Sequence, residues 1–227
     1  MGKVIALVPV KEISERVPNK NFREFGAGQS LFSRKIQQLV SSSVDEIYVS
    51  TNSRNLLSSQ SISATLLPRD ERYCNNEAPW SEVITAVLAD IPEPDDVTLV
   101  WAHTTVPFFS RFDEAVREYE LRRGLGSSDS LLSTSVVSEF LLSPSGLPVN
   151  YQWGKWHSYS QNLPRYRAVT GGVFVLSLGL ARELGYLVGR APFFFDSGGD
   201  EALDIDSLDE FRYAHWLQTG GLSAGSD

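Results

Sequence analysis

Cysteine is nearly absent from this sequence, because Cys74 is the only one among 227 residues. A lone cysteine cannot form a disulfide within the chain, so a disulfide-stapled secreted protein is not expected and a cytoplasmic setting is favoured. The thiol itself is predicted to be a buried or idle group rather than a nucleophile.

Positive charge is also scarce. Lys and Arg together number 20 against 28 Asp and Glu, which gives a formal net charge of −8. Non-specific binding to nucleic acid depends on an excess of cations, so we exclude nucleic acid as a partner. A small phosphorylated ligand remains compatible, because a few local cations decide such binding and the total charge does not.

Long apolar runs are missing as well. No run approaches the roughly 20 residues of a membrane span, and the N-terminus lacks the apolar region of a signal peptide. Hydrophobic residues nevertheless make up 42% of the chain and charged residues 21%. This composition predicts a packed core, and the length fits a soluble protein with one domain over 1–227.

Short apolar runs alternate with helical patterns over the first 125 residues. Strands are predicted at 4–8, 45–51, 64–68 and 97–102, and helices are predicted to begin near Ser30, Ser81 and Ser110, with Ser81 as an N-cap. The buried faces of these helices are expected to carry Phe32, Ile36, Leu39 and Val40, then Val83, Ile84, Val87, Leu88 and Ile91, then Phe112, Ala115, Val116 and Tyr119. The alternation predicts an α/β fold with a doubly wound, mostly parallel, Rossmann-like sheet.

The rhythm changes between about 127 and 167, where serines, prolines and aromatic residues dominate. No long helical stripe appears there, so we expect a small lobe inserted into the main domain. Trp153 and Trp156 within it are predicted to be packing anchors rather than ligand-stacking residues.

The α/β pattern then resumes. A strand is predicted at 171–177, followed by a helix from about Leu178. Ser207 and Glu210 form the pattern of a capping box for a last helix. Its inward residues are expected to be Phe211, Ala214 and Leu217. The tail after Thr219 is rich in Gly and Ser and is expected to fray.

The opening segment carries a ligand signal. A predicted strand stops at Pro9, and a polar segment follows that contains Lys11 and Lys20. In open α/β sheets a nucleotide lies at the carboxyl ends of the strands, where loop amides cradle anions and lysines supply point charges for phosphate. Taken alone, the same pattern also fits an ordinary solvated turn.

A second signal lies near the C-terminus. Asp204 and Asp206 are two residues apart, so on an extended segment both carboxylates face the same way. Two convergent carboxylates beside phosphates are suitable ligands for Mg²⁺, with the substrate completing the coordination. On these residues alone, a solvated acidic turn before a capped helix is an equal alternative.

Both ends together resemble the cytidylyltransferases that activate acidic sugars, the CMP-sialic acid and CMP-Kdo synthetases. Their opening pattern, I-P-A-R-x-G-S-K-x-x-x-x-K-N, is matched without a gap by Pro9, Ser14, Lys20 and Asn21, with Lys11 in place of the arginine. Departures from that pattern are Glu12, Ile13 and Glu15. The closing pattern, E-x-x-D-I-D-T/S-x-x-D/E, is reproduced over 201–210.

Weaker matches lie between the ends. The resemblance implies that Arg69 and Ser81 contact the nucleotide, and that Asn52 replaces a family aspartate. Surface and capping roles are the structural alternatives for Arg69 and Ser81. Where the family has a glutamine that touches the sugar acid, this chain has His103, which can donate a hydrogen bond or carry charge near pH 6.5.

The acceptor side departs most from the family. The family asparagine that holds the sugar corresponds to Thr170, and Arg165 is placed to pair with a substrate carboxylate or phosphonate. Phe194 belongs to an aromatic run, 193–195, near which the family has contacts to the sugar. A surface or interface role is an equal alternative for Arg165.

The resemblance implies an Mg²⁺-dependent transfer of CMP from CTP to an acidic acceptor, with release of pyrophosphate. Lys11, Lys20 and Asp206 would be catalytic, Asp204 and Asp206 would hold metal, and Pro9, Ser14 and Asn21 would join the nucleotide site. The acceptor would be a nonulosonic acid, a Kdo-like sugar or a phosphonate. The inserted lobe would mediate a homodimer.

Two other functions stay open. A metal-dependent nucleotide-sugar glycosyltransferase also uses an acidic pair, although that pair normally ends a central strand in mid-chain rather than lying near residue 205. A non-catalytic nucleotide-binding module is suggested by Glu12, Ile13 and Glu15 in the loop. CTP binding without turnover would favour the module.

Overall fold

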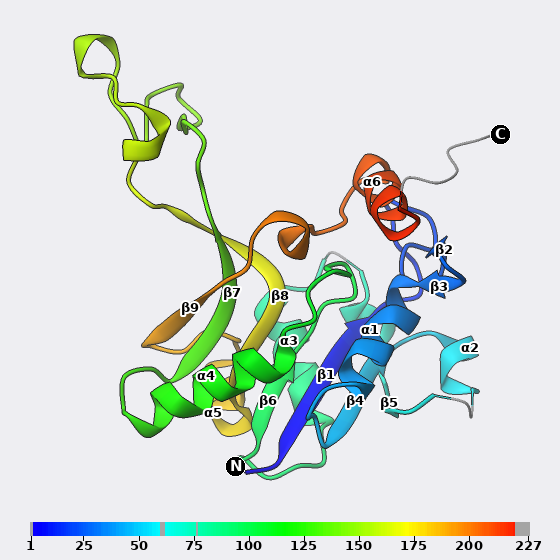
Figure 1. The fold of residues 1–227 in the computed structure, drawn as a ribbon. Coiled ribbons are helices and arrows are strands. Elements are labelled where there is room, and N and C mark those ends of the chain that lie inside the picture. The colour runs from blue at the N-terminus through cyan, green and yellow to red at the C-terminus, as the bar shows by residue number, and fades with distance from the viewer. Residues whose placement is uncertain (1, 60–61, 76, 221–227) are drawn as a thin grey trace, which may run out of the picture.

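The computed structural model describes residues 2–59, 62–75 and 77–220, and the predicted frayed tail after Thr219 lies almost entirely outside them. Its centre is a seven-stranded sheet with the order β5-β4-β1-β6-β8-β7-β9 (Figure 1). The strands are β1 (Val4–Val10), β4 (Glu46–Thr51), β5 (Thr65–Pro68), β6 (Thr98–Trp101), β7 (Ser130–Val136), β8 (Arg167–Ser177) and β9 (Pro192–Asp196). A small hairpin of β2 (Glu24–Gly26) and β3 (Gln29–Ser30) lies apart from this sheet.

The sheet is mostly parallel. β5, β4, β1 and β6 pair in parallel, and so do β7 and β9, whereas β8 runs antiparallel to both β6 and β7. The chain visits β1, β4 and β5 in turn and then returns to place β6 on the other side of β1. The junction of β1 and β6 is therefore the topological switch point, where such folds bind ligands.

Helices cover both faces of the sheet. They are α1 (Leu31–Val40), α2 (Arg54–Leu57), α3 (Trp80–Ala89), α4 (Phe112–Gly124), α5 (Leu178–Leu184) and α6 (Leu208–Gln218), with short 3₁₀ turns η1 (Glu71–Tyr73), η2 (Gly154–Trp156), η3 (Ser160–Asn162) and η4 (Gly199–Ala202). Alternate residues of β1 face opposite layers, as the pleat requires. Ala6 and Val8 pack with α1 and α4, whereas Ile5 and Leu7 pack with α3 and α5.

A third, smaller core joins the two ends of the sequence. It contains Val17, Phe25, Leu31, Ile205, Phe211 and Ala214, which come from the first loop, β2, α1, the segment that leads into α6 and α6 itself. α6 packs on β2, with Phe25 and Phe211 ring centroids 6.5 Å apart. This core places the acidic segment beside the loop that follows β1.

The α/β prediction is confirmed, and most helix faces are buried as expected. Val40 is an exception at 53% exposure, because it is the last residue of α1 and points away from the sheet. Instead, Lys35 is fully buried. Leu217 is only partly buried.

The predicted end of the first strand at Pro9 is wrong, since β1 continues to Val10 and Pro9 pairs with Ser50 of β4. The pairing with β6 ends at Leu7. Pro9 therefore has a strand neighbour on one side only, a position where the missing N–H is tolerated.

The helix caps divide into right and wrong predictions. Ser30 and Ser207 are N-caps, and each forms a capping box with the residue at N3. Ser81 is not an N-cap, because α3 begins one residue earlier at Trp80, after Pro79, and has no side-chain cap. α4 begins at Phe112 with Arg111 as its N-cap residue, two residues after the predicted start near Ser110.

The expected lobe at 127–167 is partly wrong in its bounds, because β7 occupies 130–136 and belongs to the main sheet. The segment that leaves the sheet runs from 137 to 166, and we call it the arm. Figure 1 shows it projecting far from the body of the molecule. Trp153 and Trp156 are 57% and 67% exposed there, so they do not anchor packing within this chain.

Within the part of the chain that the structure describes, no helix has both the length and the apolar character to cross a bilayer.

Candidate active site

A cavity of about 330 Å³, which we call the nucleotide pocket, opens at the carboxyl ends of β1 and β6. It gathers seven of the residues singled out from the sequence: Pro9, Lys11, Ser14, Lys20, Asn21, Arg69 and His103. They come from the end of β1 and from the loops after β1, β5 and β6, strands that all end at this edge of the sheet. The parallel topology thus assembles a site from segments that are far apart in the sequence.

The loop after β1 is held rigidly at its far end by Asn21. The Asn21 side-chain amide donates to the Lys11 carbonyl at 2.9 Å, and its oxygen accepts from the Thr104 hydroxyl at 2.8 Å. Asn21 is 5% exposed, and these bonds tie the two ends of the loop to the segment after β6. Its side chain therefore shapes the pocket through the backbone.

The side chain of Ser14 gives a separate indication of a ligand site. Its hydroxyl is buried and has no hydrogen-bond partner within the part of the chain that the structure describes, although the residue lines the nucleotide pocket. Buried hydroxyls in proteins are normally satisfied, and an orphaned one at a cavity is a position where a ligand oxygen fits.

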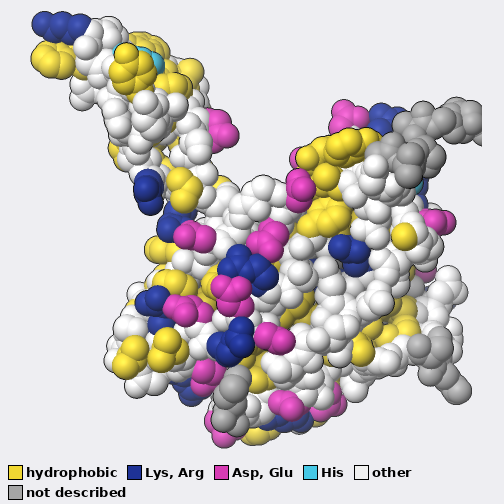
Figure 2. All heavy atoms as spheres, viewed as in Figure 1, with side chains coloured by type: hydrophobic (Ala, Val, Ile, Leu, Met, Phe, Trp, Pro, Cys, Tyr) yellow, Lys and Arg dark blue, Asp and Glu magenta, His cyan; other side chains and the backbone are white. Residues whose placement is uncertain are grey.

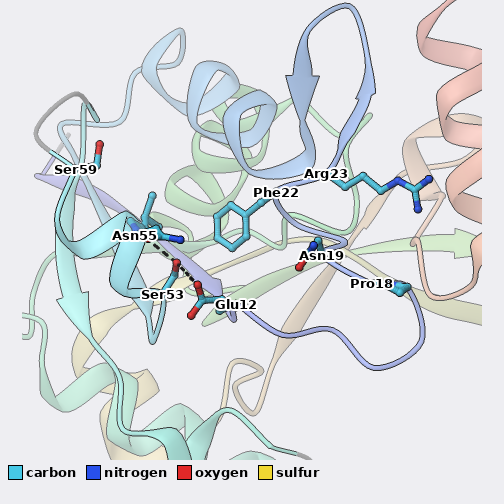
Figure 3. Close-up of a pocket in the computed structure, with 9 residues that line it drawn as sticks. Glu12, Pro18, Asn19, Phe22, Arg23, Ser53, Asn55 and Ser59 are labelled. Atoms are coloured by element: carbon cyan, nitrogen blue, oxygen red, sulfur yellow. Dashed lines mark hydrogen bonds between the residues drawn. The ribbon is translucent and has the colours of Figure 1, made fainter.

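The acidic departure Glu12 turns away from the nucleotide pocket. It lines a separate cavity of about 770 Å³ together with Asn19 and Phe22. Figure 3 shows these three side chains around that cavity. The Ser53 hydroxyl donates to the Glu12 carboxylate at 3.3 Å, and the Glu12 N–H donates to the Asn52 side-chain oxygen at 2.9 Å. Ile13 and Glu15 are both exposed. The loop's unusual residues thus do not fill the nucleotide pocket.

Lys20 and Asp206 meet at the edge of this pocket, although 186 residues separate them in the sequence. The Lys20 ammonium lies 3.4 Å from an Asp206 carboxylate oxygen, and an Arg16 guanidinium nitrogen lies 2.8 Å from the same oxygen. Lys20 also donates to the Ile205 carbonyl, and the Ile205 N–H donates to the Thr105 carbonyl at 2.8 Å. The acidic segment is therefore fixed to the loops after β1 and β6.

Ile205 is fully buried, so the carboxylates of Asp204 and Asp206 on either side of it point away from the core. Asp204 remains accessible, but it lies in a concave region where partial burial and the nearby charge of Asp206 raise its pKa. A hydrogen bond from Thr105 opposes that change. Among the described residues, no three His, Cys, Asp or Glu side chains form a metal cluster, so the pair would need ligand oxygens to complete a metal shell.

His103 is held as a neutral ring. Burial, with smaller contributions from the charges of Lys35 and Lys20, lowers its pKa to about 4. Its Nε2 accepts from the Trp101 indole N–H at 3.1 Å, so in the neutral ring the proton resides on Nδ1. This lowered pKa favours a hydrogen-bond donor over a charged group at this position.

A second cavity of about 280 Å³ adjoins the first, and we call it the aromatic pocket. It is lined by Trp80, His103, Val169, Gly171, Phe174, Tyr186, Leu187 and Asp204. Trp80 and His103 line both cavities, so the two spaces share a wall. A second substrate bound there would lie next to a nucleotide in the first.

Five predicted site residues lie outside both linings, and one of them is Asp206, which instead contacts Lys20 at the edge of the nucleotide pocket. Ser81 is exposed in the first turn of α3, and Arg165 is exposed at the base of the arm. The Thr170 hydroxyl is buried and bonded to Ser133 at 2.9 Å and Ser197 at 3.2 Å. Phe194 lies on the edge strand β9, 46% exposed, with the Arg167 guanidinium 5.8 Å from its ring.

Several lining residues were missed by sequence reasoning. The nucleotide pocket also contains Tyr73, Cys74, Asn75, Ala78, Trp80, Val83, Thr104 and Thr105. Thr104 and Thr105 directly follow His103 in the sequence, and this position after a predicted strand could have indicated that they line the site. Cys74 accepts a hydrogen bond from Arg69 Nε at 3.2 Å, and burial raises the pKa of its thiol, which fits an unreactive group.

Comparison with protein-family models and with curated protein sequences gave no match. Solved structures match over nearly the whole chain. A CMP:2-keto-3-deoxy-manno-octonic acid synthetase complexed with CTP has 11% identity and a TM-score of 0.64, covering 95% of this chain and 98% of that one. The 2-C-methyl-D-erythritol 4-phosphate cytidylyltransferase of Francisella tularensis has 13% identity and a TM-score of 0.66, covering 94% and 99%.

The 2-C-methyl-D-erythritol 4-phosphate cytidylyltransferase of Thermus thermophilus is 16% identical with a TM-score of 0.60, covering 95% of this chain and 98% of that one. At these identities the likeness concerns the fold. The chain thus has the fold of these cytidylyltransferases, as its resemblance to the CMP-sugar acid synthetases predicted.

Proposed function

We propose that this chain is a cytidylyltransferase that transfers CMP from CTP to a hydroxyl of an acceptor and releases pyrophosphate. The observation that carries the proposal is the meeting of Lys20 and Asp206 beside a cavity at the switch point of the sheet. A cation for phosphate and a carboxylate for metal are thereby brought to one place. The fold shared with cytidylyltransferases of known structure supports the choice of reaction.

The triphosphate would lie along the loop after β1. Lys11 and Lys20 would neutralise its charge and that of the departing pyrophosphate, and Arg69 would approach from the end of β5. The unpartnered Ser14 hydroxyl would bond a phosphate or ribose oxygen. Little covalent chemistry is required of the protein, because positioning and charge neutralisation lower the barrier to this reaction.

Asp204 and Asp206 would hold Mg²⁺, and their oxygens are of the kind that this ion binds. The ion supplies charge neutralisation at the phosphate oxygens and acidifies a nearby hydroxyl. Asp206 contacts Lys20 and Arg16, and Asp204 borders the aromatic pocket, so the pair lies between the two cavities. The acceptor hydroxyl would enter from the aromatic pocket, with His103 Nδ1–H available as a donor.

The acceptor predicted from the sequence is acidic: a nonulosonic acid, a Kdo-like sugar or a phosphonate. Within this proposal, the acid group of the acceptor would form an ion pair with a cationic side chain at the opening of the site. The single cysteine supports a cytoplasmic setting. The projecting arm, with its exposed aromatic residues, supports a homodimer.

The test is pyrophosphate release by purified protein with Mg²⁺, each of CTP, ATP, GTP and UTP, and a panel of 2-keto sugar acids, phosphonates and neutral polyols. Release is expected with CTP. Asp206→Asn should lower turnover at least about 100-fold with the fold intact, because it removes a metal-binding charge.

Asp209→Asn is the matched control, since Asp209 is exposed in α6 and forms a local ion pair with Arg212 at 3.1 Å. It should leave turnover unchanged. The proposal would be contradicted if no combination in the panel releases pyrophosphate, or if Asp206→Asn and the parent chain have equal turnover. CTP binding by calorimetry without any turnover would support the non-catalytic module instead.

A further inference from the structure

The aromatic pocket has an unusual charge balance for a site that receives an acid. Among the described residues that line it there is no Lys or Arg, and the one charged group is the Asp204 carboxylate. The cations of the neighbouring nucleotide pocket, Lys11, Lys20 and Arg69, are needed there for phosphates. An anion in the aromatic pocket would therefore lack a cationic partner, which is costly in a partly desolvated space.

The two arginines nearest in sequence to β8 do not supply that partner. Arg165 is exposed at the base of the arm and lines neither pocket. Arg167 is already engaged, because its guanidinium pairs with Asp196 and donates to the Thr134 hydroxyl at 2.9 Å. Its ion pair lies on the β7–β9 side of the sheet, where Thr134 pairs with Asp196.

What the pocket offers instead is ring surface and two neutral donors, the His103 N–H and the Tyr186 O–H. Trp80, Phe174 and Tyr186 contribute aromatic rings, and His103 lies 6.3 Å from Trp80 and 6.1 Å from Phe174 between ring centroids. The Trp101 indole fixes the orientation of His103 by donating to its Nε2. Such a lining suits the apolar face of a sugar ring or a short acyl or methyl group with one oxygen acceptor.

Resting on the proposed function, we infer that the aromatic pocket receives an uncharged and partly apolar portion of the acceptor, such as a deoxygenated or acylated part of a sugar. An acid group on the same acceptor lies outside this pocket. Trp80 is the specificity-determining residue, because it forms the wall shared by the two cavities.

The inference is tested by binding rather than by turnover. Three methyl pyranosides of one configuration are used as probes that differ only at the terminal carbon: the 6-deoxy sugar, the parent hexose and the uronate. Each is titrated by saturation-transfer NMR into the full chain in the presence of CTP. The 6-deoxy probe should bind at least about fivefold more tightly than the uronate, since only the uronate brings an unpaired charge.

Trp80→Ala should weaken the 6-deoxy probe about tenfold and remove the preference, whereas Trp80→Phe should retain most of it. Trp216→Ala is the control, because Trp216 is 52% exposed on α6 and lines neither pocket. Thermal melting checks that each variant folds. Binding of none of the probes, tightest binding of the uronate, or a preference that survives in Trp80→Ala would overturn the inference.

The two proposals can fail separately. If the 6-deoxy probe binds through Trp80 but no acceptor and nucleotide pair yields pyrophosphate, the enzymatic proposal fails and the pocket assignment stands. If pyrophosphate is released while the uronate is preferred, the pocket assignment fails alone.

Discussion

His103 illustrates how the surroundings of one residue decide its chemistry. An isolated histidine titrates near pH 6.5 and could present either a charge or a neutral ring. In this fold its ring lies between Trp80, Trp101 and Phe174, and the ammonium groups of Lys20 and Lys35 are close enough to act on it. Both effects disfavour the charged form, so His103 acts as a neutral donor.

The lowered pKa of His103 predicts a pH dependence of stability. Between pH 6.5 and 4 the unfolded chain binds a proton that the folded chain does not, so the free energy of unfolding falls as the pH falls through this window. From pH 7.5 to 5 this one group should remove about 2 kcal/mol. Urea denaturation of the parent chain and of His103→Gln at both pH values measures it.

The difference in unfolding free energy between the parent and His103→Gln should therefore shift with pH by that amount. A constant difference from pH 7.5 to 5 would mean that the folded ring titrates normally.

At the scale of elements, α1 determines the course of the loop that follows His103. Lys35 is buried, and its ammonium donates to the carbonyls of Val106 at 2.9 Å and Phe109 at 3.0 Å. Arg34 Nε and Gln38 Nε2 both donate to the Pro107 carbonyl, at 2.9 and 2.8 Å. One helix thus supplies hydrogen-bond donors to three backbone carbonyls of this loop.

Lys35→Met should lower the free energy of unfolding by about 2 kcal/mol, because it leaves two buried carbonyls without a donor. Burial and the charge of Arg34 lower the pKa of Lys35 to about 7. Since the unfolded lysine titrates near 10.5, the parent chain should gain stability relative to Lys35→Met as the pH rises from 7 to 9.

Lys155→Met, at an exposed position of the arm, is the control and should change the unfolding free energy by less than about 0.5 kcal/mol. A Lys35→Met protein as stable as the parent at every pH would show that the loop holds its shape without this helix.

A second element-scale constraint is the close approach of β8 to the loop after β6. A Cβ added at Gly172 would lie 2.8 Å from Cγ of the buried Phe109 ring. Gly172→Ala should therefore destabilise the protein by about 1–3 kcal/mol through overpacking. Gly124→Ala, at the end of α4 where a Cβ meets nothing within 4 Å, should be neutral or stabilising in the same thermal melt.

At the scale of the whole molecule, exposed apolar residues also gather at two places away from the pockets, the arm and α6. Figure 2 shows hydrophobic side chains at the tip of the arm and over α6. On the arm, Trp153, Trp156 and Tyr159 are 57%, 67% and 76% exposed. Such rings on a projecting segment are costly to leave in water, which is why we propose that the arm is a dimer contact.

Sedimentation velocity at micromolar concentration should show a dimer for the parent chain. The double substitution Trp153→Ser and Trp156→Ser should shift it to a monomer, because two large apolar contacts are lost. Trp216→Ser removes an equally exposed ring from α6 and should leave the dimer in place. A monomeric parent chain at every concentration tested would contradict the proposed assembly.

Much of the fold could be predicted from local patterns. The stripes of α3 and α4 and the capping boxes at Ser30 and Ser207 follow from residues within a few positions of one another. β7 and β9 were not predicted, because β7 pairs with β8 and β9 pairs with β7, and these partners lie far apart along the chain. The lobe was consequently predicted to begin at 127, whereas the arm begins at 137.

For the site, the sequence by itself determined which residue types stand at the ends of the strands, because turn chemistry and hydrophobic periodicity are local properties. Only the tertiary structure decided that Lys20 meets Asp206, that Glu12 turns away from the nucleotide pocket, and that the Thr170 hydroxyl donates to Ser133. Those outcomes depend on through-space distance and burial, since contacts such as the one across 186 residues exist only after the sheet has formed and its cores have packed.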